Sequence, residues 1–499
     1  MKNYSLLSQV SAKASSLFSI QSGSYSVNKI ILLLLMISLA LGNLLLINVL
    51  NSFNAFSYLK VAMVFLLFGC GSFILSRPNV LLATIKLLLI LIPILGFTMS
   101  PKRLGFDIFQ AISIILLLIL AHNFFWRKKT INLIPDKLAF VLLISALPAV
   151  FLGISPLDSA LCYFKIVLCY VFFITLHAYL SEKGAFVETV KYLAIALIFV
   201  SLSIYFERLT GINLSGTSKN LNAFVEGVNI FRFGGFFQDP QKAGQFLAVG
   251  ATFLILLTCQ NIPLGRKITL LINFSLFVSL GAILLTVSKN SIISGFLFSL
   301  IGLFFFNRNT QLKKQLLFIV PLTLFVLLAF SGKVTSSFLE SSLGVRMLRI
   351  ENSVNIRLNI WNENWNLLKS HIIGGIGPGN YQEFLMRADP SLRAIKAERG
   401  YVPGQPESGY LKILFETGIL GLLGMVIFFI GNAAKMMKYF LHFLQGKPLG
   451  IYVSASFAII VFALCYITLF TTSDSRNSLI FLIMYAIFSN TKYEELSFS

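Results

Sequence analysis

Charge is scarce in this sequence, and acidic charge is the scarcest. Only 12% of the 499 residues are charged, with 19 Asp and Glu against 40 Lys and Arg, whereas soluble domains average about 25%. Hydrophobic residues make up 57% of the chain, and the mean hydropathy is +0.84. This composition excludes the string of ordinary soluble domains that the length alone would suggest.

Cysteine and histidine are also sparse. The five cysteines all lie inside apolar stretches: Cys70, Cys162, Cys169, Cys259 and Cys465. No disulfide framework is therefore predicted. The four histidines are scattered, no Cys/His cluster has metal-ligand spacing, and no Asp-x-Asp pair is present to hold a metal for a nucleotide-sugar. We predict a site without a metal or a cofactor.

The net charge of +21 would indicate nucleic acid in a soluble protein. Membrane proteins, however, carry excess Lys and Arg in their cytoplasmic loops. Nothing in the sequence resembles a nucleic-acid-binding module, so we predict the lipid bilayer, and not nucleic acid, as a partner.

Long apolar stretches are what the sequence has instead, many of about 20 residues, the length that crosses a bilayer as a helix. Fourteen candidates occur, at 30–50, 58–75, 79–98, 107–125, 138–154, 160–180, 185–206, 241–259, 268–287, 290–306, 315–331, 409–430, 449–471 and 477–489. They predict an all-α polytopic membrane protein with about 12–14 transmembrane helices.

Basic residues alternate between the connecting loops, which predicts the orientation. Loops rich in Lys and Arg, such as 127–129 and 266–267, alternate with loops poor in charge, so both termini are predicted to be cytoplasmic. The predicted organisation is a cytoplasmic tail (1–27), a membrane domain of about 11 helices (28–331) with an outside loop (207–240), an outside cap (332–408), C-terminal membrane helices (409–490) and a second tail (491–499).

Polar side chains gather near the outside loops. Arg232 precedes Gly234-Gly235, and Asp239 is predicted to cap a helix that starts at Pro240 and carries Lys242. Lys289 lies in the short turn between two apolar spans. Each has a plain structural alternative, namely an interfacial cation, a helix cap or an anchoring lysine.

The long loop has a pattern of its own. Apolar residues at helical spacing predict an amphipathic helix over 354–370, capped by Asn352 or Ser353 and carrying Arg357 and Trp361. Gly377-Pro378-Gly379 predicts a turn, and Asn380 with Glu383 a capping pair for a short helix. Such a turn either binds an anion or is only a tight turn.

Glu407 stands immediately before the span that contains Tyr410. A carboxylate at this boundary is partly desolvated, which suits it to general-base work. The alternative is a carboxylate placed favourably at a helix N-terminus.

Three motifs resemble the O-antigen ligase/polymerase family. They read Arg357-x-x-x-Trp361, Gly375-Ile376-Gly377-Pro378-Gly379-Asn380-Tyr381 and Glu407-Ser408-Gly409-Tyr410-Leu411, continuing to Glu416-x-Gly418. Residues around Arg232, Asp239 and Lys289 also look like earlier motifs of the family, so the resemblance covers about 230–430.

The resemblance implies a glycosyltransferase of the GT-C type in the bacterial inner membrane, with its two large loops periplasmic. Its donor would be a glycan on undecaprenyl pyrophosphate. Arg232 and Arg357 would bind the pyrophosphate and Glu407 would act as the base. Lys289, Asp239, Lys242, Tyr410, Trp361, Gly377 and Gly379 would bind substrate.

Two positions depart from the family pattern. Family ligases typically have His-Asn where this chain has Glu407-Ser408, and arginine is common where it has Lys289. The first departure favours a polysaccharide polymerase, with a chain-length regulator as a candidate partner. A ligase that uses lipid A-core or another acceptor is the alternative. A flippase or transporter, with Lys165 as its buried charge, is an alternative of another class.

Overall fold

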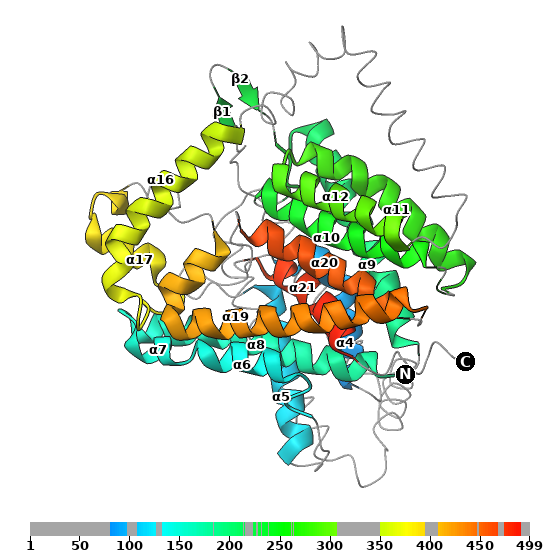
Figure 1. Ribbon diagram of the computed structural model, residues 1–499, viewed down its shortest axis with the longest axis horizontal. Coiled ribbons are helices and arrows are strands. Elements are labelled where there is room, and N and C mark those ends of the chain that lie inside the picture. The colour runs from blue at the N-terminus through cyan, green and yellow to red at the C-terminus, as the bar shows by residue number, and fades with distance from the viewer. Residues whose placement is uncertain are drawn as a thin grey trace, which may run out of the picture. The chain divides into compact units, whose positions relative to one another are not determined.

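The computed structural model describes residues 80–96, 107–125, 132–182, 184–212, 214, 223–225, 228–230, 232–237, 239–260, 262, 264–306, 350–394, 408–446, 449–467 and 474–490. The chain divides into two compact units, Met1–Ala83 and Thr84–Ser499. Of the first unit only Val80–Ala83 are described, so the account concerns the second (Figure 1).

Helices dominate the described residues. Their bounds are α4 Val80–Leu91, η1 Ile92–Ile94, α5 Ile108–Phe125, α6 Lys137–Ser145, α7 Pro148–Leu152, α8 Pro156–Leu180, α9 Ala185–Thr210, α10 Pro240–Cys259, α11 Arg266–Leu285, α12 Lys289–Phe306, α16 Ile350–Leu368, η2 Lys369–His371, α17 Tyr381–Ala388, α19 Gly409–Leu444, α20 Gly450–Tyr466 and α21 Ser475–Ser489. The predicted all-α class is confirmed. One small antiparallel hairpin is added, in which β1 (Ala223–Val225) pairs with β2 (Val228–Ile230) and Val225 lies opposite Val228.

Five described helices, α8, α9, α10, α11 and α19, are long and apolar enough to cross a membrane. The outward face of α11 shows why a bilayer is needed, because Leu270, Phe274 and Phe277 are 60%, 54% and 80% exposed at helical spacing. The chain is therefore a polytopic membrane protein. The predicted count of about 12–14 helices stays a prediction, since spans 30–50, 58–75 and 315–331 lie outside the described residues.

Helix α10 is the centre of the bundle. It contacts α9, α11, α12, α20 and α21, and 78% of its most apolar stretch is buried, against 39% to 56% in the other four spans. Its glycines allow this close approach. A Cβ on Gly244 would come within 2.8 Å of Thr286 Oγ1, and one on Gly250 within 2.7 Å of Leu197.

A second group of helices forms along α19, which lies beside α6 and also contacts α7 and α20 (Figure 1). Lys435 Nζ of α19 pairs with Asp136 Oδ2 at 2.6 Å, and Tyr485 Oη of α21 donates to Asp136 Oδ1 at 2.9 Å. This end of the bundle, where α6 begins, lies away from the start of α21. We call it the opposite end. Burial opposes ionisation of Asp136, but the hydrogen bond and charge of Lys435 outweigh it and lower the pKa of Asp136.

Two span predictions need correction. The predicted span 138–154 is two helices, α6 and α7, because Pro148 cannot continue a helix from Ser145. Helix α19 runs 36 residues, to Leu444, past the predicted end at 430. The apolar pattern ends there because the helix acquires charged residues such as Lys435, and not because the backbone changes.

The cap predicted over 332–408 is described from Ile350 to Ala394. Helix α16 confirms the predicted amphipathic helix, but Asn352 and Ser353 lie inside it, so the predicted N-cap is wrong because Ile350 and Glu351 already belong to the helix. Helix α17 starts directly after Asn380 as predicted, yet the Asn380 side chain does not cap it. Its amide donates instead to Ser159 Oγ at 2.8 Å and to the Ile376 carbonyl at 3.0 Å.

Candidate active site

Four helices begin at one end of the bundle, which we call the site end: α10, α12, α19 and α21. Asn477 of α21 donates to the carbonyl of Lys242 on α10 at 3.2 Å. Ser294 of α12 contacts Cys465 of α20 at 3.4 Å, and a Cβ on Gly409 of α19 would meet the Tyr466 ring. Because helix N-termini carry partial positive charge, their convergence favours an anion at the site end.

The predicted cap of α10 is confirmed. Asp239 Oδ1 accepts a hydrogen bond from Gln241 N at 2.8 Å, with Pro240 at the first helical position. The carboxylate therefore has a structural task, while Lys242, in the first turn of α10, is partly exposed. Its backbone carbonyl accepts the hydrogen bond from Asn477, which places Lys242 beside the start of α21.

Arg232 lies beside the turn that contains Lys289. Arg232 Nε donates to the Thr286 carbonyl at 3.4 Å, and the next residue, Phe233, donates from its backbone N to the Leu285 carbonyl at 3.3 Å. Lys289 starts α12 and is partly exposed. The structure thus brings together the two predicted cations that come from separate segments of the chain.

The turn itself holds strained backbone. Val287 has a φ of 49°, a region that β-branched residues rarely adopt and that costs on the order of 1–3 kcal/mol. Hydrogen bonds hold it in place: Val287 N donates to the Leu284 carbonyl at 3.1 Å, and Ser288 Oγ bonds Ser291 Oγ at 2.8 Å. Strain that surrounding contacts maintain is typical of functional sites.

Glu407, the predicted base, lies outside the described residues. Ser408, next to it, is buried and is the N-cap residue of α19. Tyr410 Oη donates to the Ala463 carbonyl at 3.0 Å, and its ring meets the Tyr466 ring edge-on at 5.3 Å. Tyr410 therefore joins α19 to α20, and its predicted contact with substrate stays a prediction.

Arg357 and Trp361 lie one turn apart on α16, with Asn364 and Leu368 continuing the same face. Asn364 Oδ1 accepts from Tyr381 Oη, and Leu368 belongs to a buried cluster with Ile376 and Phe415. Arg357 is partly exposed. Within the described residues, the buried indole N–H of Trp361 meets no acceptor. The meeting of Arg357 with Arg232 stays a prediction.

The glycine-rich loop 374–379 lies against a break in α19. Gly418 has φ 68° and ψ −167° inside that helix. Three backbone hydrogen bonds cross from the loop region: Ile376 N to the Phe415 carbonyl, Gly377 N to the Glu416 carbonyl and Ile419 N to the Ile372 carbonyl, each at 2.9 Å. The backbone carbonyls of Phe415 and Glu416 and the amide of Ile419, which the break frees, are therefore used locally.

Glu416 was missed as a candidate from the sequence. Its side chain is buried, the backbone amides of Gly379 and Tyr381 donate to its carboxylate, and Lys412 Nζ lies 3.7 Å away. The start of α17, where a bound anion was one of the two alternatives that the sequence left open, thus holds a carboxylate of this chain. An ionisable residue inside a span was the available signal. Contact of Gly377 and Gly379 with substrate stays a prediction.

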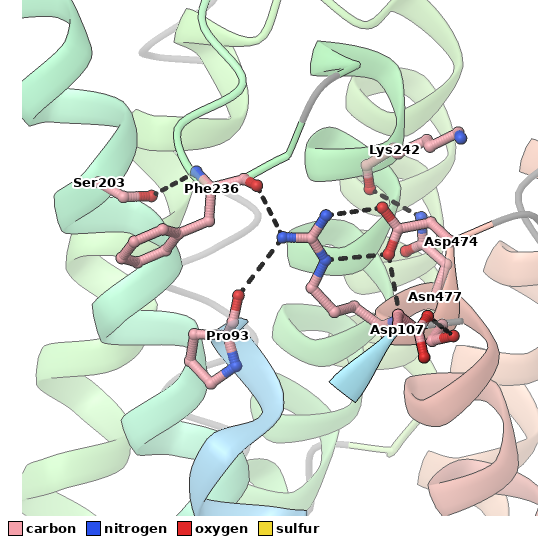
Figure 2. Close-up of polar contacts among 9 residues, drawn as sticks. Pro93, Asp107, Ser203, Phe236, Lys242, Asp474 and Asn477 are labelled. Carbon is pink, nitrogen blue, oxygen red and sulfur yellow. Dashed lines mark hydrogen bonds and ion pairs between the residues drawn. The ribbon is translucent and has the colours of Figure 1, made fainter. Parts of the chain in front are cut away.

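Other charged residues, which the sequence analysis did not single out, lie around the segment that follows Arg232. They are Glu207 of α9, and Asp474 and Arg476 at the start of α21, with Asp107 beside them, all largely buried. Figure 2 shows how the segments around Pro93, Asp107, Phe236 and Asp474 meet there. The signal available in the sequence was the pair of charged residues, Asp474 and Arg476, directly before a short apolar stretch.

Comparison with known proteins gives a match to a family model over part of the chain. Residues 274–426 match the family model described as O-antigen ligase, and no curated protein matches the chain. The matched segment contains the Lys289 turn, α16 with Arg357 and Trp361, the glycine-rich loop and the break in α19, while Arg232 and α10 precede it. Over residues 274–426, this chain is therefore similar to the O-antigen ligase family.

Proposed function

We propose that this protein is a polysaccharide polymerase of the O-antigen type. It moves a growing glycan from undecaprenyl pyrophosphate to a lipid-linked repeat unit at the periplasmic face of the inner membrane. The observation that carries the proposal is the site end, where Arg232, Lys242 and Lys289 join four helix N-termini.

The leaving group explains why cations are needed. In the transfer, an acceptor hydroxyl attacks the anomeric carbon, and the bond from that carbon to the pyrophosphate oxygen breaks. Undecaprenyl pyrophosphate leaves with the bonding electrons, so its negative charge grows. Fixed cations and helix N-termini stabilise such charge without a metal. Arg232, from the bundle, and Arg357, from α16, are the proposed ligands, since guanidinium groups match phosphate oxygens.

The proton of the acceptor hydroxyl needs a base. We assign this role to Glu407, which precedes Ser408 at the start of α19. Family ligases typically have a histidine there, and the carboxylate in this chain is the reason to prefer a polymerase. A ligase that uses lipid A-core or another acceptor is the alternative.

A transporter is the competing class, and the break at Gly418 is the feature that favours it. In transporters, unwound carbonyls coordinate the cargo or a coupling ion. Here the Phe415 and Glu416 carbonyls accept from Ile376 N and Gly377 N, so the break has a local use in anchoring the loop. An enzyme is therefore the better reading.

The orientation is part of the proposal. Positive charge in alternate loops puts both termini in the cytoplasm and puts 207–240 and 332–408 in the periplasm. In support, Pro93, Phe236 and Arg476, which this orientation puts on one side, are joined by hydrogen bonds.

Deletion of the gene followed by gel analysis of the surface polysaccharide tests the proposal. A polymerase predicts that only a single repeat unit remains attached. Loss of all attached glycan, with lipid-linked chains accumulating, supports the ligase, and normal long chains refute both. Arg357→Ala and Glu407→Ala should each abolish chain extension while the protein still inserts. Co-purification with a chain-length regulator would identify the predicted partner.

A further inference from the structure

The segment between Arg232 and α10 makes a tight turn through Gly234, Gly235 and Phe236. Gly235 has a φ of 60°, and a Cβ there would collide with Ser203 Oγ. Gly234 is equally confined, since a Cβ would come within 2.5 Å of the Phe237 carbonyl oxygen. The turn is thus pressed against α9, and its backbone polar groups point to two sides.

One side of the turn is held by α9. Glu207 Oε2 accepts from Gly234 N at 2.9 Å and from Gly235 N at 2.7 Å, and Ser203 Oγ accepts from Phe236 N at 3.1 Å. Glu207 is only 3% exposed. A buried carboxylate is costly unless it is hydrogen-bonded, so Glu207 and the two glycine amides require each other.

The other side is held by Arg476. Its Nη1 donates to the Phe236 carbonyl at 2.7 Å, and its guanidinium lies 3.8 Å from the centre of the Phe237 ring. Asp474 orients this guanidinium with two hydrogen bonds, at 2.9 Å to Nε and 2.7 Å to Nη2.

Asp474 is ionised in this arrangement. Burial opposes its ionisation, but the charge and hydrogen bonds of Arg476 outweigh burial and lower the pKa of Asp474. Arg476 is 2% exposed, so the pair forms a rigid, paired unit at the start of α21.

We propose that Glu207 and Arg476 are positioning residues that fix Arg232 for the pyrophosphate of the donor. Glu207 accepts hydrogen bonds from the amides of the turn, and Arg476 donates one to the Phe236 carbonyl. Phe233 N donates to a carbonyl at the end of α11. The backbone that carries Arg232 is therefore held in place by hydrogen bonds of the residues that follow it. The inference rests on the proposed function, because it assigns Arg232 to the leaving group. Neither residue touches substrate in this account.

Binding of undecaprenyl pyrophosphate without a glycan tests the inference. The full-length protein is placed in nanodiscs, and the Kd is measured by native mass spectrometry. Glu207→Ala and Arg476→Lys should each weaken binding by roughly 10-fold, because each removes hydrogen bonds to a charged group that hold the turn carrying Arg232. Glu207→Gln, which keeps an acceptor oxygen, should restore binding to within roughly 5-fold of the wild type.

Non-additivity separates positioning from general stability. In an Arg232→Ala background, Glu207→Ala should cause no further loss of affinity, because it acts only through Arg232. Asp136→Asn at the opposite end is the control, and it should lower thermal stability without changing the Kd. If Glu207→Ala does not insert, Ser203→Ala removes the acceptor of Phe236 N, together with a hydrogen bond to the Val200 carbonyl within α9, and should weaken binding several-fold.

The outcomes distinguish the two claims. Loss of affinity in Arg232→Ala but not in Glu207→Ala, Arg476→Lys or Ser203→Ala overturns this inference and leaves the proposed function standing. Equal further loss in the double variant also overturns it, since the role would then be structural. No binding to the wild type overturns the proposed function and this inference together.

Discussion

Replacement of Gly418 by alanine tests whether the break in α19 anchors the glycine-rich loop. Gly418 adopts φ 68° and ψ −167° inside α19, and a Cβ there would come within 2.6 Å of the Ile373 carbonyl oxygen and 2.7 Å of Gly375 N. Gly375 faces it, because a Cβ on Gly375 would come within 2.6 Å of Gly418 N. Neither segment can move without breaking the other's hydrogen bonds.

The magnitude follows from two terms. Strain for a side chain in this backbone region is about 1–3 kcal/mol. Displacing the loop forfeits the three hydrogen bonds made by Ile376, Gly377 and Ile419, at about 1 kcal/mol each. Gly418→Ala should therefore lose about 4–6 kcal/mol of unfolding free energy. Because α16 carries Arg357 and is joined to this loop, chain extension should fall with it.

Gly446 provides the matched control. It follows the same helix with a φ of 88°, and a Cβ there meets nothing within 4 Å. Gly446→Ala should cost only the backbone term, about 1–2 kcal/mol, and leave the polysaccharide ladder unchanged. The assay is reversible unfolding in mixed micelles of rising SDS content. Equal losses in the two variants would refute the anchoring role of the break.

Three further predictions concern separate parts of the site. Val287→Gly should change unfolding free energy by no more than about 1 kcal/mol, because relief of strain offsets lost burial, yet turnover should fall as the Lys289 turn loosens; a loss above about 3 kcal/mol in SDS unfolding would show that no strain is stored. Tyr410→Phe should cost about 1 kcal/mol and leave chain length on gels unchanged, and a shortened ladder would instead support contact with substrate. Asp136→Asn should lower the melting temperature in nanodiscs, and the wild type should lose this contribution as pH falls through the lowered pKa of Asp136; an unchanged melting temperature would contradict the role of the Lys435 pair.

Local chemistry predicted the helices well because their signals are local. Pro240 after Asp239 marks the start of α10 by fixed φ and a side-chain cap, and apolar length marks the spans. The same signals failed where a helix continues beyond its apolar residues, as α19 does from 430 to Leu444. The apolar pattern ends at 430, but the helix does not.

The sequence pattern could not predict contacts between segments that are distant in the chain. Gly418 looks like any helical glycine until Gly375 is seen against it. Asn380 looks like a cap until its amide is seen donating to Ser159 of another helix. Glu207 and Arg476 are separated by much of the chain, and only folding brings both to the Gly234–Phe236 turn.

The candidate site was predicted in part. Asp239 caps its helix as predicted, and Arg232 contacts the turn that contains Lys289. The glycine-rich turn holds Glu416, which no spacing rule indicated, since an acidic side chain four residues after Lys412 also fits a plain helical ion pair.

Chain extension by the purified protein tests the central claim most directly. The protein is reconstituted in nanodiscs with repeat units linked to undecaprenyl pyrophosphate, and the products are separated on a gel. A polymerase predicts a ladder of longer lipid-linked chains without any other acceptor, and Glu407→Ala should leave single units. Absence of extension until lipid A-core is supplied, followed by transfer to it, would contradict the account and establish a ligase.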